Sequence, residues 1–168
     1  EHTGEIVYNE EEMLIPAVKY PEISEPSCEL HVIDCRESDE NSTLLEAAHV
    51  GEYIKEEHDG VEVLGIHLEG PFISPKFAGA QPLNYIIPCD VEVFKEINEA
   101  SLNTIKQVSY ACEENGLEFT KYLAENKIIA SIGHSNSDHE TVIKAVDLGA
   151  TSVTHTYNAQ RGIHHRDI

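Results

Sequence analysis

The regular alternation of helix-like and strand-like segments from Asn41 onward constrains the fold of this chain more than any other feature. Alternation of this kind is typical of βα units arranged around a parallel sheet. The apolar pattern predicts helices from residue 43 to about 58 and over 91–100, 117–126 and 137–149, and strands over 61–68, 104–110, 127–132 and 151–154. We therefore predict an α/β fold built from consecutive βα units.

Two capping boxes mark helix starts. Thr43 with Glu46, and Ser137 with Glu140, have the spacing at which a hydroxyl and a carboxylate satisfy the first free N–H groups of a helix. Gly149 is placed to end the later helix, because glycine readily adopts the left-handed backbone of a helix end.

Residues 1–40 do not follow this alternation. Three prolines interrupt an acidic stretch in which residues 5–8 and 30–34 are the only clear strand candidates. We expect an unassigned N-terminal segment over residues 1–40 and a partial barrel domain over residues 41–168.

Composition limits the possible partners and location. The net charge of −20 argues against nucleic acid or an anionic membrane as a partner, because both require clustered Lys and Arg. No apolar run reaches the ~18 residues of a membrane span, and no signal peptide is recognisable, so we expect a cytoplasmic protein. The four cysteines, Cys28, Cys35, Cys89 and Cys112, show no C-x-x-C spacing, and we predict reduced, buried thiols.

Three possible metal ligands occupy equivalent places in the βα pattern. Glu69, His134 and His155 each follow a predicted strand. Such positions converge at one face of a parallel βα barrel. A carboxylate with two imidazoles leaves a coordination position open, as in catalytic rather than structural zinc sites. Each residue alone is more often a solvated or hydrogen-bonded side chain than a metal ligand, but their joint placement predicts a metal-dependent hydrolase acting on an amide or ester.

The residues around these ligands carry a family resemblance. The segments HLEGPF at 67–72, GHSN at 133–136 and THTYNA at 154–159 resemble the metal-site signatures of N-acetylglucosamine-6-phosphate deacetylases, which belong to the amidohydrolase superfamily. The resemblance covers residues 43–167. It implies a (β/α)8 TIM-barrel, of which this chain would be a central, partial portion.

The resemblance also implies roles for individual residues. Glu69, His134 and His155 would bind one divalent ion, Zn²⁺ or Fe²⁺, and Asn158 and Ala159 would hold the phosphate of a phosphorylated amino sugar. Arg166 would reach the phosphate bound by the neighbouring subunit of a homodimer, a task that suits its planar, bidentate guanidinium.

Gln81 departs from the family pattern. It stands where the family often has a histidine that helps to polarise the acetyl carbonyl, and it can donate a hydrogen bond but cannot carry a proton. The His-x-His strand found near the start of many barrels of this superfamily is absent, which favours one ion.

The implied reaction is hydrolysis of N-acetylglucosamine 6-phosphate to acetate and glucosamine 6-phosphate. In the family the general acid/base is an aspartate on the last barrel strand, which would lie beyond Ile168. No catalytic residue is therefore assigned, and we expect this chain alone not to be an efficient deacetylase. Two alternatives remain open: another amidohydrolase reaction on a different amide or sugar phosphate, and a catalytically inactive fragment that binds metal or sugar phosphate.

Overall fold

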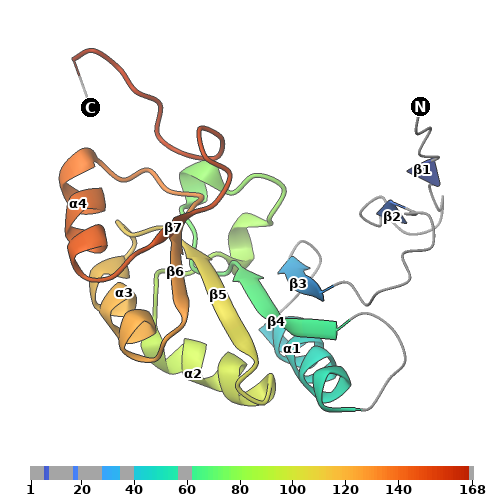
Figure 1. Ribbon diagram of the computed structural model, residues 1–168. Coiled ribbons are helices and arrows are strands. Elements are labelled where there is room, and N and C mark those ends of the chain that lie inside the picture. The colour runs from blue at the N-terminus through green and yellow to red at the C-terminus, as the bar shows by residue number, and fades with distance from the viewer. Residues whose placement is uncertain (1–5, 8–16, 19–27, 35–39, 57–61, 167–168) are drawn as a thin grey trace.

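A five-stranded parallel sheet organises the chain. The computed structural model describes residues 6–7, 17–18, 28–34, 40–56 and 62–166. The strands follow one another across the sheet in the order β3-β4-β5-β6-β7, which is also their order in the chain (Figure 1). Their bounds are Cys28–Asp34 for β3, Glu62–Glu69 for β4, Ile105–Tyr110 for β5, Ile129–Ile132 for β6 and Ser152–Val153 for β7. Two short antiparallel strands, β1 (Ile6–Val7) and β2 (Ala17–Val18), form a separate pair.

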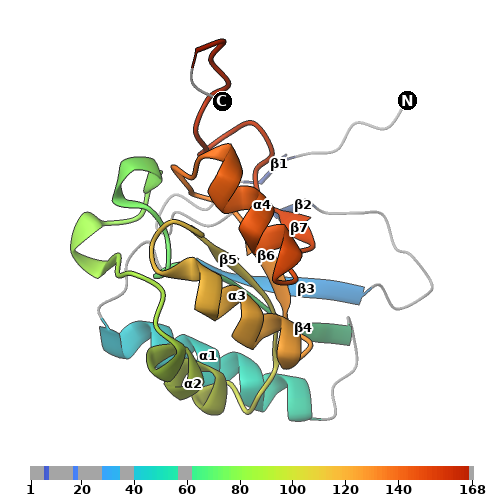
Figure 2. The same ribbon diagram turned by 90° about the vertical axis from the view of Figure 1, so that its left-hand side faces the viewer.

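Helices connect the strands of the sheet and cover one of its faces. They are α1 (Glu40–Lys55), α2 (Val91–Ala100), α3 (Gly116–Glu125) and α4 (His139–Asp147), and two 3-10 turns, η1 (Pro75–Phe77) and η2 (Leu83–Tyr85), lie between β4 and α2. Figure 2 shows the four helices in front of the sheet, on the same side of it. The predicted α/β fold of consecutive βα units is confirmed.

The helix starts differ from the two predicted capping boxes. Helix α1 begins at Glu40, so Thr43 is a buried residue inside the helix and not its cap. Helix α4 is capped by Asp138, whose carboxylate accepts the N–H of Thr141 at 2.8 Å. Ser137 cannot serve as the cap because its hydroxyl donates to the carboxylate of Glu113. Both capping predictions were therefore wrong, although the helices were correctly expected.

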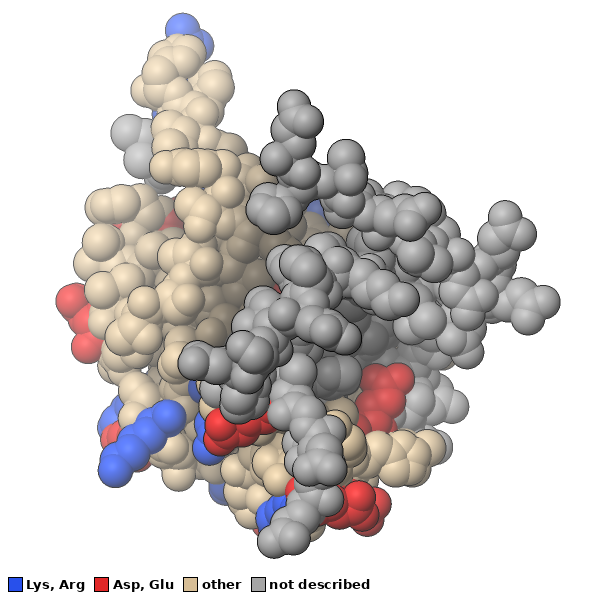
Figure 3. All heavy atoms as spheres, turned by 45° about the vertical axis from the view of Figure 1, so that its right-hand side comes forward, with Lys and Arg blue, Asp and Glu red and all other residues tan. Residues whose placement is uncertain are grey.

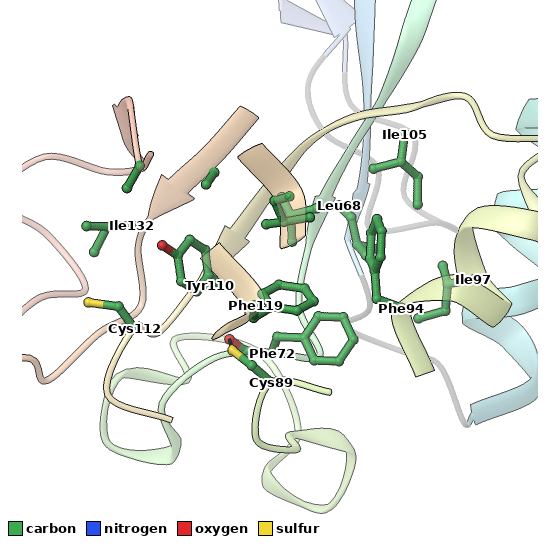
Figure 4. Packing of buried hydrophobic residues seen from close by; sticks show 14 of the residues in the cluster. Leu68, Phe72, Cys89, Phe94, Ile97, Ile105, Tyr110, Cys112, Phe119 and Ile132 are labelled. Atoms are coloured by element: carbon green, nitrogen blue, oxygen red, sulfur yellow. Dashed lines mark hydrogen bonds between the residues drawn. The ribbon is translucent and has the colours of Figure 1, made fainter. Parts of the chain in front are cut away.

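The core lies between the sheet and the helices and is rich in aromatic rings (Figure 4). Phe119 on α3 is central: its ring centroid lies 5.0 Å from that of Phe72, 5.6 Å from that of Phe94 and 5.7 Å from that of Tyr110. All four side chains are at most 1% exposed. Each fully buried aromatic or aliphatic side chain stabilises the fold by roughly 1.5–3 kcal/mol.

Local sequence signals place helix α2 against this core. The Asp90 carboxylate accepts the N–H groups of Glu92 and Val93, which satisfies two of the free donors at the helix start. Phe94 and Ile97, three residues apart, lie on one face of the helix and are buried.

Part of the N-terminal segment left unassigned by the sequence joins the sheet. Strand β3 pairs in parallel with β4, from Cys28 opposite Glu62 to Asp34 opposite Glu69. The domain boundary at residue 40 remains a prediction. Cys89 and Cys112 are free and buried, as predicted, whereas Cys35 and the side chain of Cys28 lie outside what the structure describes.

On the face seen in Figure 3, the charged side chains of the described residues are unevenly spread. In the view of Figure 3, the described Lys, Arg, Asp and Glu residues gather mainly toward the lower end, and the described surface above them is mostly uncharged. Within the described part of the chain, no helix is long and apolar enough to cross a membrane.

Candidate metal centre

The three predicted ligands meet at the carboxyl ends of β4, β6 and β7. The sequence predicted that the first of these strands ends at residue 68 and that Glu69 follows it. In the structure β4 extends one residue further, so Glu69 is its last residue. His134 follows the end of β6 by two residues, and His155 follows the end of β7 by two residues. Parallel pairing puts these strand ends at the same edge of the sheet.

The ligand atoms converge on one carboxylate oxygen. Nε2 of His134 and Nε2 of His155 each lie 3.0 Å from Oε1 of Glu69. All three atoms lie within 4.8 Å of one another. The side chains of His134 and Glu69 are 7% and 13% exposed, whereas that of His155 is 47% exposed, so one side of the cluster is accessible from solvent.

A second contact of His134 fixes which ring nitrogen can bind a metal. Its Nδ1 lies 2.6 Å from the backbone carbonyl of Phe77 in η1. A carbonyl only accepts hydrogen bonds, so Nδ1 carries the proton and Nε2 presents its lone pair toward Glu69. The lone pair and the carboxylate oxygen repel each other unless a cation or a shared proton lies between them. The donor set therefore fits a divalent ion, whose tetrahedral ligands at ~2.0–2.2 Å would be about 3.3–3.6 Å apart.

The charge on Glu69 is consistent with this arrangement. When a proton lies between His134 and the carboxylate, that hydrogen bond, together with the one to His155, lowers the pKa of the Glu69 carboxyl to about 2 despite the opposing effect of burial. The carboxylate is therefore ionised at neutral pH, the form that binds a metal.

Both histidines have a left-handed backbone. The φ angle is +48° at His134 and +56° at His155, and it is also positive at Tyr157 and Ala159. Such a conformation costs a non-glycine residue roughly 1–2 kcal/mol. Residues held in this way concentrate at functional sites, because the surrounding structure must impose the geometry.

A chain of polar side chains crosses the sheet beneath the cluster. Nε2 of His67 lies 2.6 Å from Oγ of Ser109, which lies 2.6 Å from Oγ1 of Thr154, which in turn lies 2.7 Å from Oγ of Ser131. We call these four buried residues the polar inner layer. Burial lowers the pKa of His67, which favours its neutral form. The sequence analysis did not predict this layer. The signal that could have revealed it is the placement of polar residues at alternate strand positions, such as His67 and Glu69.

Thr154 connects the turns that carry the two histidines. Its hydroxyl bonds to Ser109 and Ser131, and its carbonyl accepts the side-chain N–H of Gln160 at 2.9 Å. It also packs on Gly133, where an added Cβ would lie 2.7 Å from the Cβ of Thr154. Only glycine fits at position 133, directly before His134.

Gln81 is positioned beside Glu69. Its buried side chain donates from Nε2 to the backbone carbonyl of Glu69 at 2.9 Å. Its Oε1 would lie 2.3 Å from a Cβ at position 70, so the close approach requires Gly70. The sequence placed Gln81 at the site, and the structure brings it against the first ligand.

The other predicted binding residues lie on the segment after β7. The N–H of Asn158 donates to the carbonyl of His155 at 2.6 Å, and the carbonyl of Ala159 accepts the N–H of Ser135 at 3.2 Å. These two residues are thus tied to the turns of the two histidines. Arg166 is exposed, and the C-terminal segment that carries it extends away from the sheet in Figure 1.

A pocket elsewhere in the molecule has the wrong chemistry for the predicted metal. It has a volume of about 650 Å³, lies by the first residues of α2 and α3, and its lining includes Cys89, Cys112 and Glu113. Burial raises the pKa of both thiols above the ordinary value for cysteine, so they are protonated at neutral pH. Among the residues that the structure describes, the lining also contains no histidine, so the pocket lacks the imidazoles of the predicted ligand set.

Comparison with known proteins supports the resemblance seen in the sequence. No family model matches the chain. It is 50% identical over 110 residues to an N-acetylglucosamine-6-phosphate deacetylase of Lysinibacillus sphaericus and 48% identical over 109 residues to that of Bacillus subtilis, which cover 65% and 64% of this chain. The chain spans about 28% of the length of these relatives.

Solved structures agree with this assignment. A mutant of N-acetyl-D-glucosamine-6-phosphate deacetylase from Mycobacterium smegmatis, in complex with N-acetyl-D-glucosamine-6-phosphate, matches with a TM-score of 0.74 and 25% identity. The match covers 82% of this chain and 35% of that one. The Thermotoga maritima deacetylase matches with a TM-score of 0.71 and 28% identity, over 83% of this chain and 36% of that one. The predicted partial (β/α)8 barrel is confirmed.

Proposed function

We propose, from the premise that this chain is similar in sequence and in fold to part of N-acetylglucosamine-6-phosphate deacetylases, that it forms the metal centre of such an enzyme. The reaction is hydrolysis of the acetamide of N-acetylglucosamine 6-phosphate to acetate and glucosamine 6-phosphate. One observation carries the proposal: the ligand atoms of Glu69, His134 and His155 lie within 4.8 Å of one another at the strand ends. The domain over residues 41–168 and a cytoplasmic location belong to this proposal.

In this proposal Glu69, His134 and His155 hold one divalent ion, Zn²⁺ or Fe²⁺. Imidazole and carboxylate ligands suit both metals, and three protein ligands leave a position for water or substrate. The ion, when bound, would lower the pKa of a water molecule and polarise the acetyl carbonyl. The exposed side of His155 is where substrate would approach.

The protein's own groups orient this centre. The Phe77 carbonyl fixes the ring of His134, as a carbonyl partner commonly does for a metal-bound histidine. One N–H of the Gln81 amide holds the carbonyl of Glu69, and we assign its second N–H to the acetyl oxygen of the substrate. Gln81 would then orient the amide without exchanging a proton with it.

Phosphate recognition is assigned to the segment after His155. Asn158 and Ala159 would contact the sugar phosphate, partly through backbone groups, and Arg166 would reach the phosphate bound by the other protomer of a homodimer. A net charge of −20 disfavours an anionic substrate at long range, so local donors and a guanidinium must supply the attraction.

A segment exchange tests the proposal. The region of the Lysinibacillus sphaericus deacetylase that matches this chain would be replaced by the corresponding residues of this chain, and acetate release from N-acetylglucosamine 6-phosphate measured with Zn²⁺ or Fe²⁺. We expect turnover that is lost on chelation and in the same exchange carrying His134→Ala. An exchanged protein that folds and binds metal but releases no acetate would contradict the proposal.

Substrate choice is tested in the same protein. Unphosphorylated N-acetylglucosamine and N-acetylgalactosamine 6-phosphate, the substrate named for a relative that is 31% identical, serve as competitors. Arg166→Ala should weaken use of N-acetylglucosamine 6-phosphate far more than use of the unphosphorylated N-acetylglucosamine. An equal effect on both sugars would assign Arg166 a structural role.

A further inference from the structure

Glu113 stands out as a partly buried carboxylate whose hydrogen bonds all go to the turn that follows His134. It lies three residues after β5, and neither the sequence motifs nor the metal cluster include it. Its Oε2 accepts the hydroxyls of Ser135 and Ser137, each at 2.7 Å. Its Oε1 accepts the backbone N–H of Asn136. One side chain thus binds all three residues that come directly after a metal ligand.

Ser135 carries this restraint to a second segment. Its N–H donates to the carbonyl of Ala159 at 3.2 Å, and its carbonyl accepts the N–H of Arg161 at 3.1 Å. Ser135 and Gln160 thereby form an isolated parallel bridge. By holding Ser135, Glu113 also fixes where the segment after His155 crosses the turn of His134.

The His134 turn needs restraint from outside itself. His134 has a φ of +48°, which a non-glycine residue adopts only when neighbouring contacts impose it. Before the ligand, Gly133 donates its N–H to the carbonyl of Tyr110 at 3.1 Å. After it, residues 135–137 belong to no helix or strand, and Glu113 accepts two of their hydroxyls and the N–H of Asn136. Without that carboxylate, two hydroxyls and one N–H in a largely buried turn would each lose a partner.

We propose that Glu113 is a positioning residue that holds the His134 turn in the geometry in which Nε2 faces Glu69. Its hydrogen bonds go to Ser135, Asn136 and Ser137, not to the ligands' donor atoms, so it acts through that turn. The inference rests on the proposed metal centre. Outer partners of metal ligands typically change metal affinity by ~10–100-fold when removed, and we expect Glu113 to fall in this range.

The test compares Glu113→Gln with the unaltered 168-residue chain in titrations with Zn²⁺. Glutamine has nearly the same shape, but its NH₂ cannot accept, so it cannot serve the hydroxyls of Ser135 and Ser137 and the N–H of Asn136 at once. We expect Glu113→Gln to weaken Zn²⁺ binding by ~10–100-fold and to accelerate amide hydrogen exchange in residues 133–137 and 159–161. Glu113→Asp, which keeps the charge on a shorter side chain, should recover part of the affinity.

Asp90→Ala is the control. Asp90 also accepts two backbone N–H groups, those of Glu92 and Val93, but at the start of α2. This variant should lower the stability to urea and leave Zn²⁺ affinity within about twofold, since α2 carries no ligand. A purely structural Glu113 would behave in the same way as Asp90.

Three results would overturn the inference. Glu113→Gln could keep its Zn²⁺ affinity within twofold of the unaltered chain. Alternatively, Glu113→Gln and Asp90→Ala could lose affinity equally, in proportion to their loss of stability. If the unaltered chain takes up no Zn²⁺, the proposed metal centre itself fails, and that outcome is recognised before any variant is compared.

Discussion

The two faces of the same strands have opposite chemistry. On the helix side, Leu68 of β4 and Val108 of β5 are fully buried among aromatic rings that need no polar partner. On the other side, the neighbouring residues His67 and Ser109 belong to the polar inner layer, where each hydroxyl or imidazole depends on the next. Because successive strand residues point to opposite faces, one sequence supplies both. We infer that the helix face determines stability and the other face determines the geometry of the metal centre.

The largest expected effect is the loss of metal binding in His155→Gly. The substitution removes a proposed ligand at a residue whose φ is +56°, a conformation that glycine adopts without strain. We expect no measurable Zn²⁺ uptake in a titration, while the urea stability of the metal-free chain stays equal to or above that of the unaltered chain. A metal-free protein destabilised as strongly as by a core mutation would show that the two faces are not separable.

Phe119→Ala should have the opposite profile. Phe119 is 1% exposed and contacts Phe72, Phe94 and Tyr110, so its removal leaves a cavity in the aromatic core. We expect a loss of about 3–5 kcal/mol in the free energy of unfolding, measured with urea, while the Zn²⁺ affinity of the folded fraction is unchanged. A parallel fall in the affinity of the folded fraction would contradict the division between the faces.

Thr154→Val sharpens the comparison at the polar inner layer. Valine keeps the shape of threonine but removes the hydroxyl that links Ser109 and Ser131. We expect Zn²⁺ affinity to fall by ~10–100-fold, because the turns of His134 and His155 lose their common partner.

Thr120→Val is its control. The Thr120 hydroxyl is also fully buried and contacts the hydroxyl of Tyr110 and the carbonyl of Gly116, on the helix side of the sheet. Its removal should cost about 1–3 kcal/mol of stability without changing Zn²⁺ affinity. If the two valine variants had equal Zn²⁺ affinities, the polar inner layer would have no special role in metal binding.

The sequence predicted the elements of the βα pattern because their apolar residues repeat at short range. Helix α2 was predicted with its observed bounds, Val91–Ala100, and the strands β4 to β7 within a few residues. Helix starts were harder to predict from the sequence. Ser137 has the right type and spacing for a cap, but its hydroxyl is held by Glu113, 24 residues away in the chain, and Asp138 takes the role.

The metal cluster could be predicted because parallel strands bring their carboxyl ends to one edge. The contacts that hold the ligands in place could not be predicted, because they depend on long-range packing that no local pattern encodes. The carbonyl of Phe77 reaches His134 over 57 residues, and the hydroxyl of Thr154 reaches Ser109 over 45. Positive φ angles at His134 and His155 run against local preference and appear only once the fold imposes them.

The most direct test of the central claim is X-ray absorption spectroscopy at the zinc edge of the 168-residue chain loaded with Zn²⁺ and freed of excess metal. The account predicts one zinc ion per chain, with nitrogen and oxygen neighbours at ~2.0–2.2 Å and the outer-ring scattering of imidazoles. Glu69, His134 and His155 supply those atoms. A sulfur shell at ~2.3 Å would instead place the metal at cysteines such as Cys89 and Cys112 and would contradict the assignment.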